Sequence, residues 1–231
     1  MTTAGTGPGD EAGGDTLAAL YPFLYQGGAD LGSVLADVAR STAEKAAEIV
    51  ALRRRVAEAE AARLAACAGV LARSFAAGGR LLAFGNGGSS SDAQAVAHAF
   101  LDPPMGRALP ALSLTNDIAV VTALANDIGY EVVFARQVAA WGRPGDIAVG
   151  LSTSGGSANV LAAFEEARRA GMVTVGLAGY DGGKMAEAGL DYLFVVPSSS
   201  VHRIQEAQTT IYHVLAELTQ EALAGGPGGD R

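Results

Sequence analysis

Hydrophobic positions along the chain fall into two different patterns. Between residues 16 and 79 they recur every three or four positions, for example at Ile49, Leu52 and Val56, which is typical of amphipathic helices. Gly79 closes this stretch, and glycine commonly follows the last turn of a helix. The first pattern therefore predicts N-terminal helices over residues 16–79.

After Arg80, short apolar runs alternate with helical segments. The pattern predicts strands at residues 81–84, 110–114, 146–151, 173–177 and 192–196, and helices at residues 91–100, 118–126, 131–141, 158–170 and 203–224. Such an alternation indicates a parallel sheet with helices on both faces. We therefore expect an α/β domain, a three-layer αβα sandwich, over residues 80–224. The ends of the chain, residues 1–15 and 225–231, are rich in glycine and polar residues and are expected to be frayed tails.

Composition narrows the class of protein. The chain has 231 residues, 49% of them hydrophobic, which is enough for a sizeable core and argues against a mainly disordered protein. No apolar run approaches the length of a membrane span, and the first residues lack the pattern of a signal peptide. The single cysteine, Cys67, excludes an internal disulfide and a Cys-rich zinc site, and is expected to be a core residue. A cytoplasmic protein is the simplest interpretation.

The charge balance limits the partners. A net charge of −8 and a pI of about 4.8 argue against a broad grip on the phosphate backbone of nucleic acid, which needs a surplus of Lys and Arg. Glycine is in excess, with 31 residues, and outside the tails it gathers just after apolar runs. In that position glycine allows a ligand to approach the backbone closely.

Two loops rich in glycine and serine each leave a predicted strand and enter a predicted helix. They read Gly-Asn-Gly-Gly-Ser-Ser-Ser-Asp at 85–92 and Ser-Thr-Ser-Gly-Gly-Ser-Ala-Asn at 152–159. At the carboxyl ends of parallel strands, a helix N-terminus flanked by hydroxyl groups suits the binding of a phosphate. The alternative is that both loops are only N-caps and tight turns.

Two common phosphate-binding motifs are excluded. The chain has no Gly-Lys-Ser/Thr sequence, so it is not a P-loop NTPase. Ser90 stands where the dinucleotide fingerprint needs its third glycine, and no acidic residue ends the following strand. The sequence therefore predicts a phosphate attached to another polar group, rather than a nucleotide held by either motif.

The chain resembles the sugar isomerase (SIS) fold and, within it, the phosphoheptose isomerase (sedoheptulose 7-phosphate isomerase) family. The matching segments are Gly-Asn-Gly-Gly-Ser (85–89), Ala-Asn-Asp (125–127), Arg-Pro-Gly-Asp (143–146), Ser-Thr-Ser-Gly-Gly-Ser-Ala-Asn-Val (152–160), Gly-Tyr-Asp-Gly-Gly-Lys-Met-Ala (179–186) and Arg-Ile-Gln-Glu (203–206). They lie within a region from about residue 40 to residue 222. The resemblance implies a homotetramer, or at least a homodimer, with sites at the subunit interfaces.

The resemblance also implies roles for individual residues. The expected contacts to substrate and phosphate are Asn86, Gly87, Ser89, Asp117, Ser152, Thr153, Ser154, Ser157 and Gln205. In the family the positions of Gln205 and His213 face the reacting carbons and bind a zinc ion, which makes these two residues the expected metal ligands.

The chain departs from the family where the chemistry takes place. The family has a metal-binding histidine and a basic glutamate at the positions of Ala95 and Ala99, and an arginine near the position of Pro103. Isomerisation of a ketose to an aldose needs a base that moves a proton between neighbouring carbons, and usually a group that polarises the oxygen. Alanine supplies neither function, so the presence of zinc is itself in doubt.

Three histidines are the candidate replacements. His98 lies close to both alanines, and a rotated helix would direct it at the site opposite His213, so His98 and His213 are the candidate acid/base residues. The alternative for His98 is an exposed or interface position on an alanine-rich helix. His202 is expected to precede the last helix, either as a solvent-facing residue or as a base in the loop.

Two functions from different classes remain open. The first is a phosphoheptose isomerase-like enzyme with a degenerate base and metal site. The second is a non-catalytic sugar-phosphate sensor or protein-binding adaptor, resembling the replication-initiator-binding members of the same superfamily. Neither function involves direct binding to nucleic acid or membrane.

Overall fold

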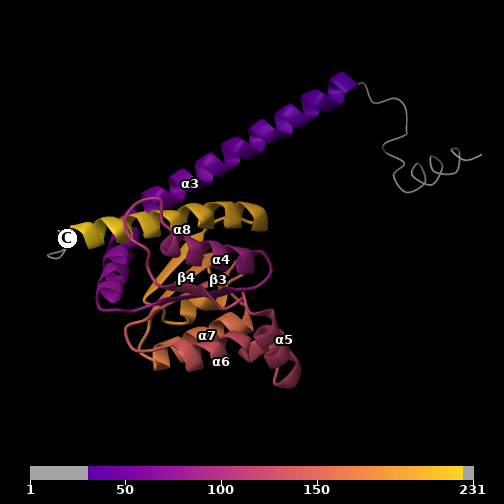
Figure 1. Ribbon diagram of the computed structural model, residues 1–231. Coiled ribbons are helices and arrows are strands. Elements are labelled where there is room, and N and C mark those ends of the chain that lie inside the picture. The colour runs from indigo at the N-terminus through magenta and orange to yellow at the C-terminus, as the bar shows by residue number, and fades with distance from the viewer. Residues whose placement is uncertain (1–30, 226–231) are drawn as a thin grey trace, which may run out of the picture. The chain divides into compact units, whose positions relative to one another are not determined.

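The structure is a computed structural model that describes residues 31–225 of the chain (Figure 1). The predicted tail at 1–15, the first part of the predicted helical segment and almost all of the predicted tail at 225–231 lie outside the described residues. The chain divides into two compact units, Met1–Ala47 and Glu48–Arg231. The second unit contains the sheet and both glycine–serine loops.

The sheet has five parallel strands in the order β2-β1-β3-β4-β5. Their bounds are β1 Leu81–Gly85, β2 Ala111–Ser113, β3 Ile147–Ser152, β4 Val173–Gly179 and β5 Tyr192–Val196. The α-helices are α3 Leu31–Ala76, α4 Gly88–Leu101, α5 Ile118–Asp127, α6 Val133–Trp141, α7 Ala158–Arg169 and α8 Val201–Ala224, with short 3₁₀ helices η1 Tyr130–Val132 and η2 Gly183–Glu187. The predicted α/β class and parallel sheet are confirmed.

Two hydrophobic clusters cover the two faces of the sheet. One joins α3 (from Leu52 onward), α4 and α8, and the other joins α6 and α7. Figure 1 shows α4 and α8 on one side of the strands and α6 and α7 on the other. Cys67 is fully buried in the first cluster, and this burial raises the pKa of its thiol to about 12, as expected for a core residue rather than a nucleophile.

The Arg-Pro-Gly-Asp segment (143–146) has a structural role at the amino edge of the sheet. The Asp146 carboxylate is almost fully buried and accepts hydrogen bonds from the backbone N–H groups of Arg80 (2.8 Å) and Arg143 (3.0 Å). It also pairs with the Arg80 guanidinium at 3.0 Å. These contacts fix the starts of β1 and β3, whose other ends carry the two glycine–serine loops.

None of the helices in the part of the chain that the structure describes is long and apolar enough to cross a membrane.

Candidate functional site

The two glycine–serine loops lie side by side. They follow β1 and β3, which are neighbouring strands paired in parallel, with Gly85 opposite Leu151 at the carboxyl edge. We refer to residues 86–91 and 152–157 as the two cups. The arrangement expected from the sequence is therefore present, because both cups open at the same edge of the sheet.

Asparagine side chains join the cups to each other. The Asn86 amide donates to Asn159 Oδ1 at 2.8 Å, and the Asn159 amide donates back to Asn86 Oδ1 at 2.9 Å. The Tyr130 hydroxyl donates to the same Asn86 oxygen at 2.9 Å. Asn86 was expected to bind the ligand, but its amide already holds the loops together. Sequence reasoning missed Asn159 and Tyr130, although Asn159 belongs to the second motif.

The helices that leave the cups begin without a side-chain cap. Gly87 precedes α4 and Ser157 precedes α7, and within residues 31–225 neither helix has a side-chain cap bond. Asp117, in contrast, caps α5 by accepting from the Val120 N–H at 3.1 Å, and Ser200 caps α8. Among the described residues, the first turns of α4 and α7 thus lack a side-chain acceptor, although the N–H groups of Ser89, Ser90 and Val160 donate to the backbone carbonyls of Asn86, Gly87 and Ser157. An anion in the cups would supply that acceptor.

Hydroxyl groups line both cups. Ser89 and Ser152 are buried, with 4% and 3% of their surface exposed, and the Ser152 and Ser157 hydroxyls lie 3.0 Å apart. Ser154 accepts from the Gly156 N–H at 3.2 Å, and Thr153 is half-buried. Buried hydroxyls at uncapped helix ends are suited to charge-assisted hydrogen bonds with an oxyanion.

Glycine is required in the second cup. Gly155 has a φ of +64°, and a Cβ at this position would collide with the backbone carbonyl of Gly182. The Gly-Tyr-Asp-Gly-Gly segment therefore packs directly against the cup, which explains why this motif accompanies the Ser-Thr-Ser-Gly segment in the sequence.

Helices α4 and α8 pack against each other beside the first cup. Both helices run away from the carboxyl edge of a parallel sheet, so they are parallel to each other. They meet at Gly88, where a Cβ would collide with the amide at the end of the Gln205 side chain. Counted from this contact, steps of seven and eleven residues along two parallel helices bring Ala95 to the level of Tyr212 and Ala99 to the level of Ala216. We call this contact, formed by Gly88, Asp92, Ala95 and Ala99 of α4 and Gln205, Thr209, Tyr212 and Ala216 of α8, the seam.

Two titratable groups of the seam have shifted pKa values. Burial raises the pKa of the Asp92 carboxyl, and a hydrogen bond to Gln205 partly offsets the rise. Burial also raises the pKa of the Tyr212 phenol, which is 4% exposed, with a smaller upward contribution from Asp92 and an opposing one from a hydrogen bond to Thr209. Sequence reasoning gave neither residue a role, although Asp92 ends the first glycine–serine loop; Tyr212 lies outside the motif segments.

The histidines do not point into the seam. His98 is exposed on α4, outside the row formed by Gly88, Asp92, Ala95 and Ala99. His213 is also exposed, and its ring lies 4.9 Å from that of Tyr212. His202 lies in the first turn of α8 rather than before it, and is exposed. The prediction that Gln205 and His213 share one face is only loosely met, because Tyr212, rather than His213, aligns with Gln205.

The residues present do not fit the zinc ion that the resemblance implies. The two expected donors, Gln205 and His213, are one neutral amide and one exposed imidazole, and a zinc site needs three or four ligands. In the described part of the chain, no three His, Cys, Asp or Glu side chains come together.

One buried polar group near the seam is unsatisfied. Gln208 is fully buried, and neither its amide nitrogen nor its oxygen has a hydrogen-bond partner within residues 31–225. A buried amide without partners typically costs about 1–3 kcal/mol, so this side chain weakens the packing of α8.

Comparison with known proteins places the chain in a family. The SIS domain matches residues 46–179, more than half of the chain. This chain is a member of the SIS-domain family. Among curated proteins, this SIS-domain chain is 45% identical over 174 residues to the phosphoheptose isomerase of Roseiflexus sp. (strain RS-1), covering 74% of this chain and 88% of that relative. It is 44% identical to the phosphoheptose isomerase of Aquifex aeolicus, covering 67% of this chain and 81% of that relative.

Solved structures agree with this placement. Phosphoheptose isomerase GmhA from Neisseria gonorrhoeae is 35% identical, with a TM-score of 0.74, and the match covers 80% of this chain and 99% of that structure. A phosphoheptose isomerase from Francisella tularensis is 31% identical, with a TM-score of 0.75, over 80% and 98% of the two chains. The resemblance stated from the motifs is therefore confirmed.

Proposed function

We propose that this SIS-domain chain binds a phosphorylated sugar in the two cups and interconverts the ketose and aldose forms of a heptose phosphate. The observation that carries the proposal is the pair of adjacent, hydroxyl-lined cups at two uncapped helix ends. Relatives named phosphoheptose isomerase, 45% and 44% identical, support sedoheptulose 7-phosphate as the first substrate to test.

The phosphate end of the ligand would be held by Ser89, Ser152, Thr153, Ser154 and Ser157 together with the backbone N–H groups of the first turns of α4 and α7. The hydroxyls donate to the phosphate oxygens, and the helix dipoles favour the negative charge. Gly87, with a φ of +57° and open space around its Cα, leaves room for the phosphate. The Asp117 carboxylate caps α5 next to the site, so we assign it a positioning role beside the sugar hydroxyls.

The sugar carbons would lie toward Gln205 and His213. Isomerisation removes a proton from the carbon that bears the terminal hydroxyl of the ketose and returns a proton to the former carbonyl carbon. His213 is the proposed acid/base group, because an imidazole ring can both accept and donate a proton. His98 lies on the exposed side of α4, so His98→Ala should reduce turnover less than His213→Ala.

The direct test is to incubate the purified full chain with sedoheptulose 7-phosphate and to follow aldose formation, with binding measured in parallel by calorimetry. Turnover that His213→Ala abolishes, with binding retained, would support the isomerase. Binding without turnover would favour the second candidate, a sugar-phosphate sensor or adaptor. The specific observation behind that candidate is the presence of Ala95 and Ala99 in the seam.

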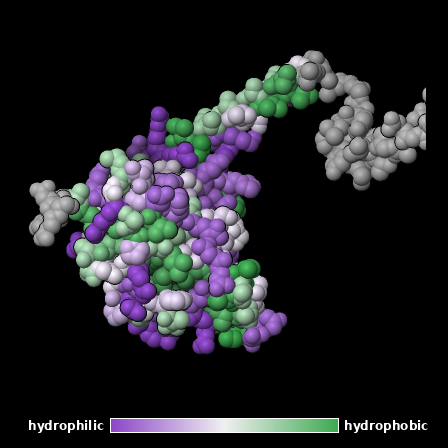
Figure 2. Space-filling model, in the orientation of Figure 1, coloured by the Kyte–Doolittle hydropathy of each residue, from purple (hydrophilic) through white to green (hydrophobic). Residues whose placement is uncertain are grey.

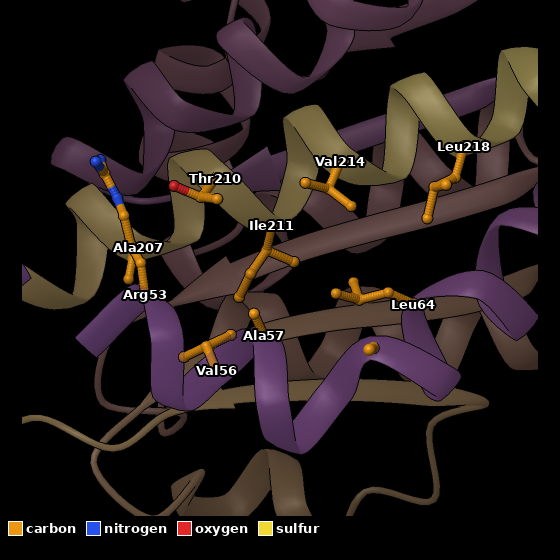
Figure 3. A pocket seen from close by; sticks show the side chains of 10 residues that line it. Arg53, Val56, Ala57, Leu64, Ala207, Thr210, Ile211, Val214 and Leu218 are labelled. Atoms are coloured by element: carbon orange, nitrogen blue, oxygen red, sulfur yellow. The ribbon is translucent and has the colours of Figure 1, made fainter. Parts of the chain in front are cut away.

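We propose in addition that the chain forms a homodimer or homotetramer. Helix α5 is rich in apolar residues, yet none of its residues is buried, and Ile118 is 69% exposed. In Figure 2 hydrophobic colour gathers over this helix. Helices α3 and α8 also border an apolar pocket lined by residues such as Val56, Leu64 and Val214 (Figure 3), on a face of α8 other than the seam. Light scattering of the purified chain tests this proposal, and a monomer at micromolar concentration would refute it.

A further inference from the structure

In the seam, Ala95 and Ala99 stand at the positions where the resemblance implies a metal-binding histidine and a glutamate. Ala95 and Ala99 carry only methyl groups, and a helix pair in contact does not keep an empty gap, because protein interiors pack at the density of organic crystals. Either the two helices approach more closely at these alanines, or a larger side chain of the facing helix fills the space opposite them.

Tyr212 is that side chain. The helical spacing counted from Gly88 and Gln205 brings it to the level of Ala95, and the residue is only 4% exposed. Tyr212, Ala99 and Ala216 belong to one hydrophobic cluster, and Ala95 packs against the same cluster.

We propose that Tyr212 closes the seam to a metal ion, so that the ligand site of this chain works without one. The proposal concerns the same site as the proposed function, but metal content and turnover are separate measurements. Two features would exclude the ion together. Ala95 and Ala99 provide no metal ligand, and the ring of Tyr212 would take the volume in which an ion would lie.

Restoring the two missing ligands should not by itself restore zinc binding. Ala95→His with Ala99→Glu returns the two missing donors but leaves the ring in place, so this double variant should still bind zinc poorly. Adding Tyr212→Val removes the ring and should increase zinc affinity at least about tenfold over the double variant, which corresponds to roughly 1.4 kcal/mol. The gain should not depend on any sugar phosphate being turned over.

The matched control is Tyr192→Val in the same double variant. Tyr192 is another tyrosine that packs against this core, with its ring stacked on that of Phe194 at a centroid distance of 6.5 Å. It lies in β5 rather than in the seam. Its truncation removes the same atoms without opening the space between α4 and α8, so zinc affinity should stay at the level of the double variant.

The experiment measures zinc by titration calorimetry and by metal analysis after desalting, with circular dichroism to establish that each variant is folded. Tyr212→Leu is the second variant if Tyr212→Val does not fold. Wild-type chain that retains stoichiometric zinc would overturn the proposal, as would a double variant that binds as tightly as the triple one. A folded triple variant that gains no affinity would equally refute it. A wild type that turns over sedoheptulose 7-phosphate without zinc leaves the isomerase intact, whichever result the zinc titration gives.

Discussion

The two cups and the seam lie next to each other, but they have different kinds of construction. The cups are polar, with uncapped helix ends and buried hydroxyls held in place by the Asn86–Asn159 pair. The seam has alanines of α4 at the level of a tyrosine of α8, and a buried amide without partners in the described residues, that of Gln208, lies near it. The cups thus suit an anion, whereas the seam has packed apolar side chains at the two positions where the resemblance implies a metal ligand and a glutamate base.

The largest effect is expected from Gly155→Ala in the second cup. The new Cβ would collide with the Gly182 carbonyl at a positive φ, so the cup must deform and sugar-phosphate binding should weaken at least about a hundredfold, by roughly 2.7 kcal/mol. Titration calorimetry measures the change. Gly145→Ala is the matched control, because Gly145 also has a positive φ but has open space around it. Equal losses of affinity in the two variants would contradict the assignment of ligand binding to the second cup.

A smaller loss is expected from Ser89→Ala. The Ser89 hydroxyl is buried at the start of α4, and removing one hydrogen bond to a charged ligand should weaken binding about tenfold to a hundredfold. Ser91→Ala, on the exposed side of the same turn, should leave the affinity unchanged. If Ser91→Ala were the more damaging of the two, the assignment of the buried hydroxyl to the phosphate would be wrong.

In the seam region the expected effects concern stability. Gln208→Met replaces a buried amide that lacks partners with an apolar side chain of similar length, which should raise the free energy of unfolding by about 1–2 kcal/mol. Thermal unfolding of the full chain measures the change. Gln220→Met is the control, because the Gln220 amide donates to the Arg107 carbonyl at 2.8 Å and its loss should destabilise the fold. A destabilised Gln208→Met variant would show that the amide has a partner.

The smallest effect is expected from Asp92→Asn. Burial raises the pKa of Asp92, so the folded state binds this proton more readily than the unfolded chain does, and the charged carboxylate at pH 7 opposes folding. The amide should therefore raise the melting temperature slightly at pH 7. This gain should shrink as the pH falls through the raised pKa, where Asp92 is already protonated. Melting curves at several pH values test the sign, and a gain that grows toward acid pH would contradict it.

Much of the fold could be predicted from the sequence, because the period of the hydrophobic residues changes clearly after Arg80. The strand at 192–196 matches β5 at both ends, and the other boundaries differ by a few residues. The helix expected from about residue 91 begins at Gly88 instead. Glycine is a poor helix former, so its presence did not indicate the first turn of α4. Helix α6 was expected from Glu131, where the structure has the 3₁₀ turn η1.

The site could be predicted only where it depends on local sequence. The cups follow from loops that each carry their own hydroxyls and glycines. The seam depends on which residues of α8 face α4. The two helices meet at Gly88 and Gln205, which lie far apart in the chain. His213 comes eight positions after Gln205, a spacing of about two turns that suggests a shared face, but the helical twist brings Tyr212 into line with Gln205 instead.

The hydrogen bond from Tyr130 to Asn86 has a mechanical consequence. Asn86 joins the two cups through its hydrogen bonds with Asn159, and it also accepts the bond from Tyr130. Tyr130 belongs to η1, which follows the apolar α5. The loops cannot shift around an incoming anion without either carrying η1 along or breaking this bond. Through this bond the first cup is joined to η1, and η1 follows the exposed apolar helix α5, for which we propose a contact between subunits.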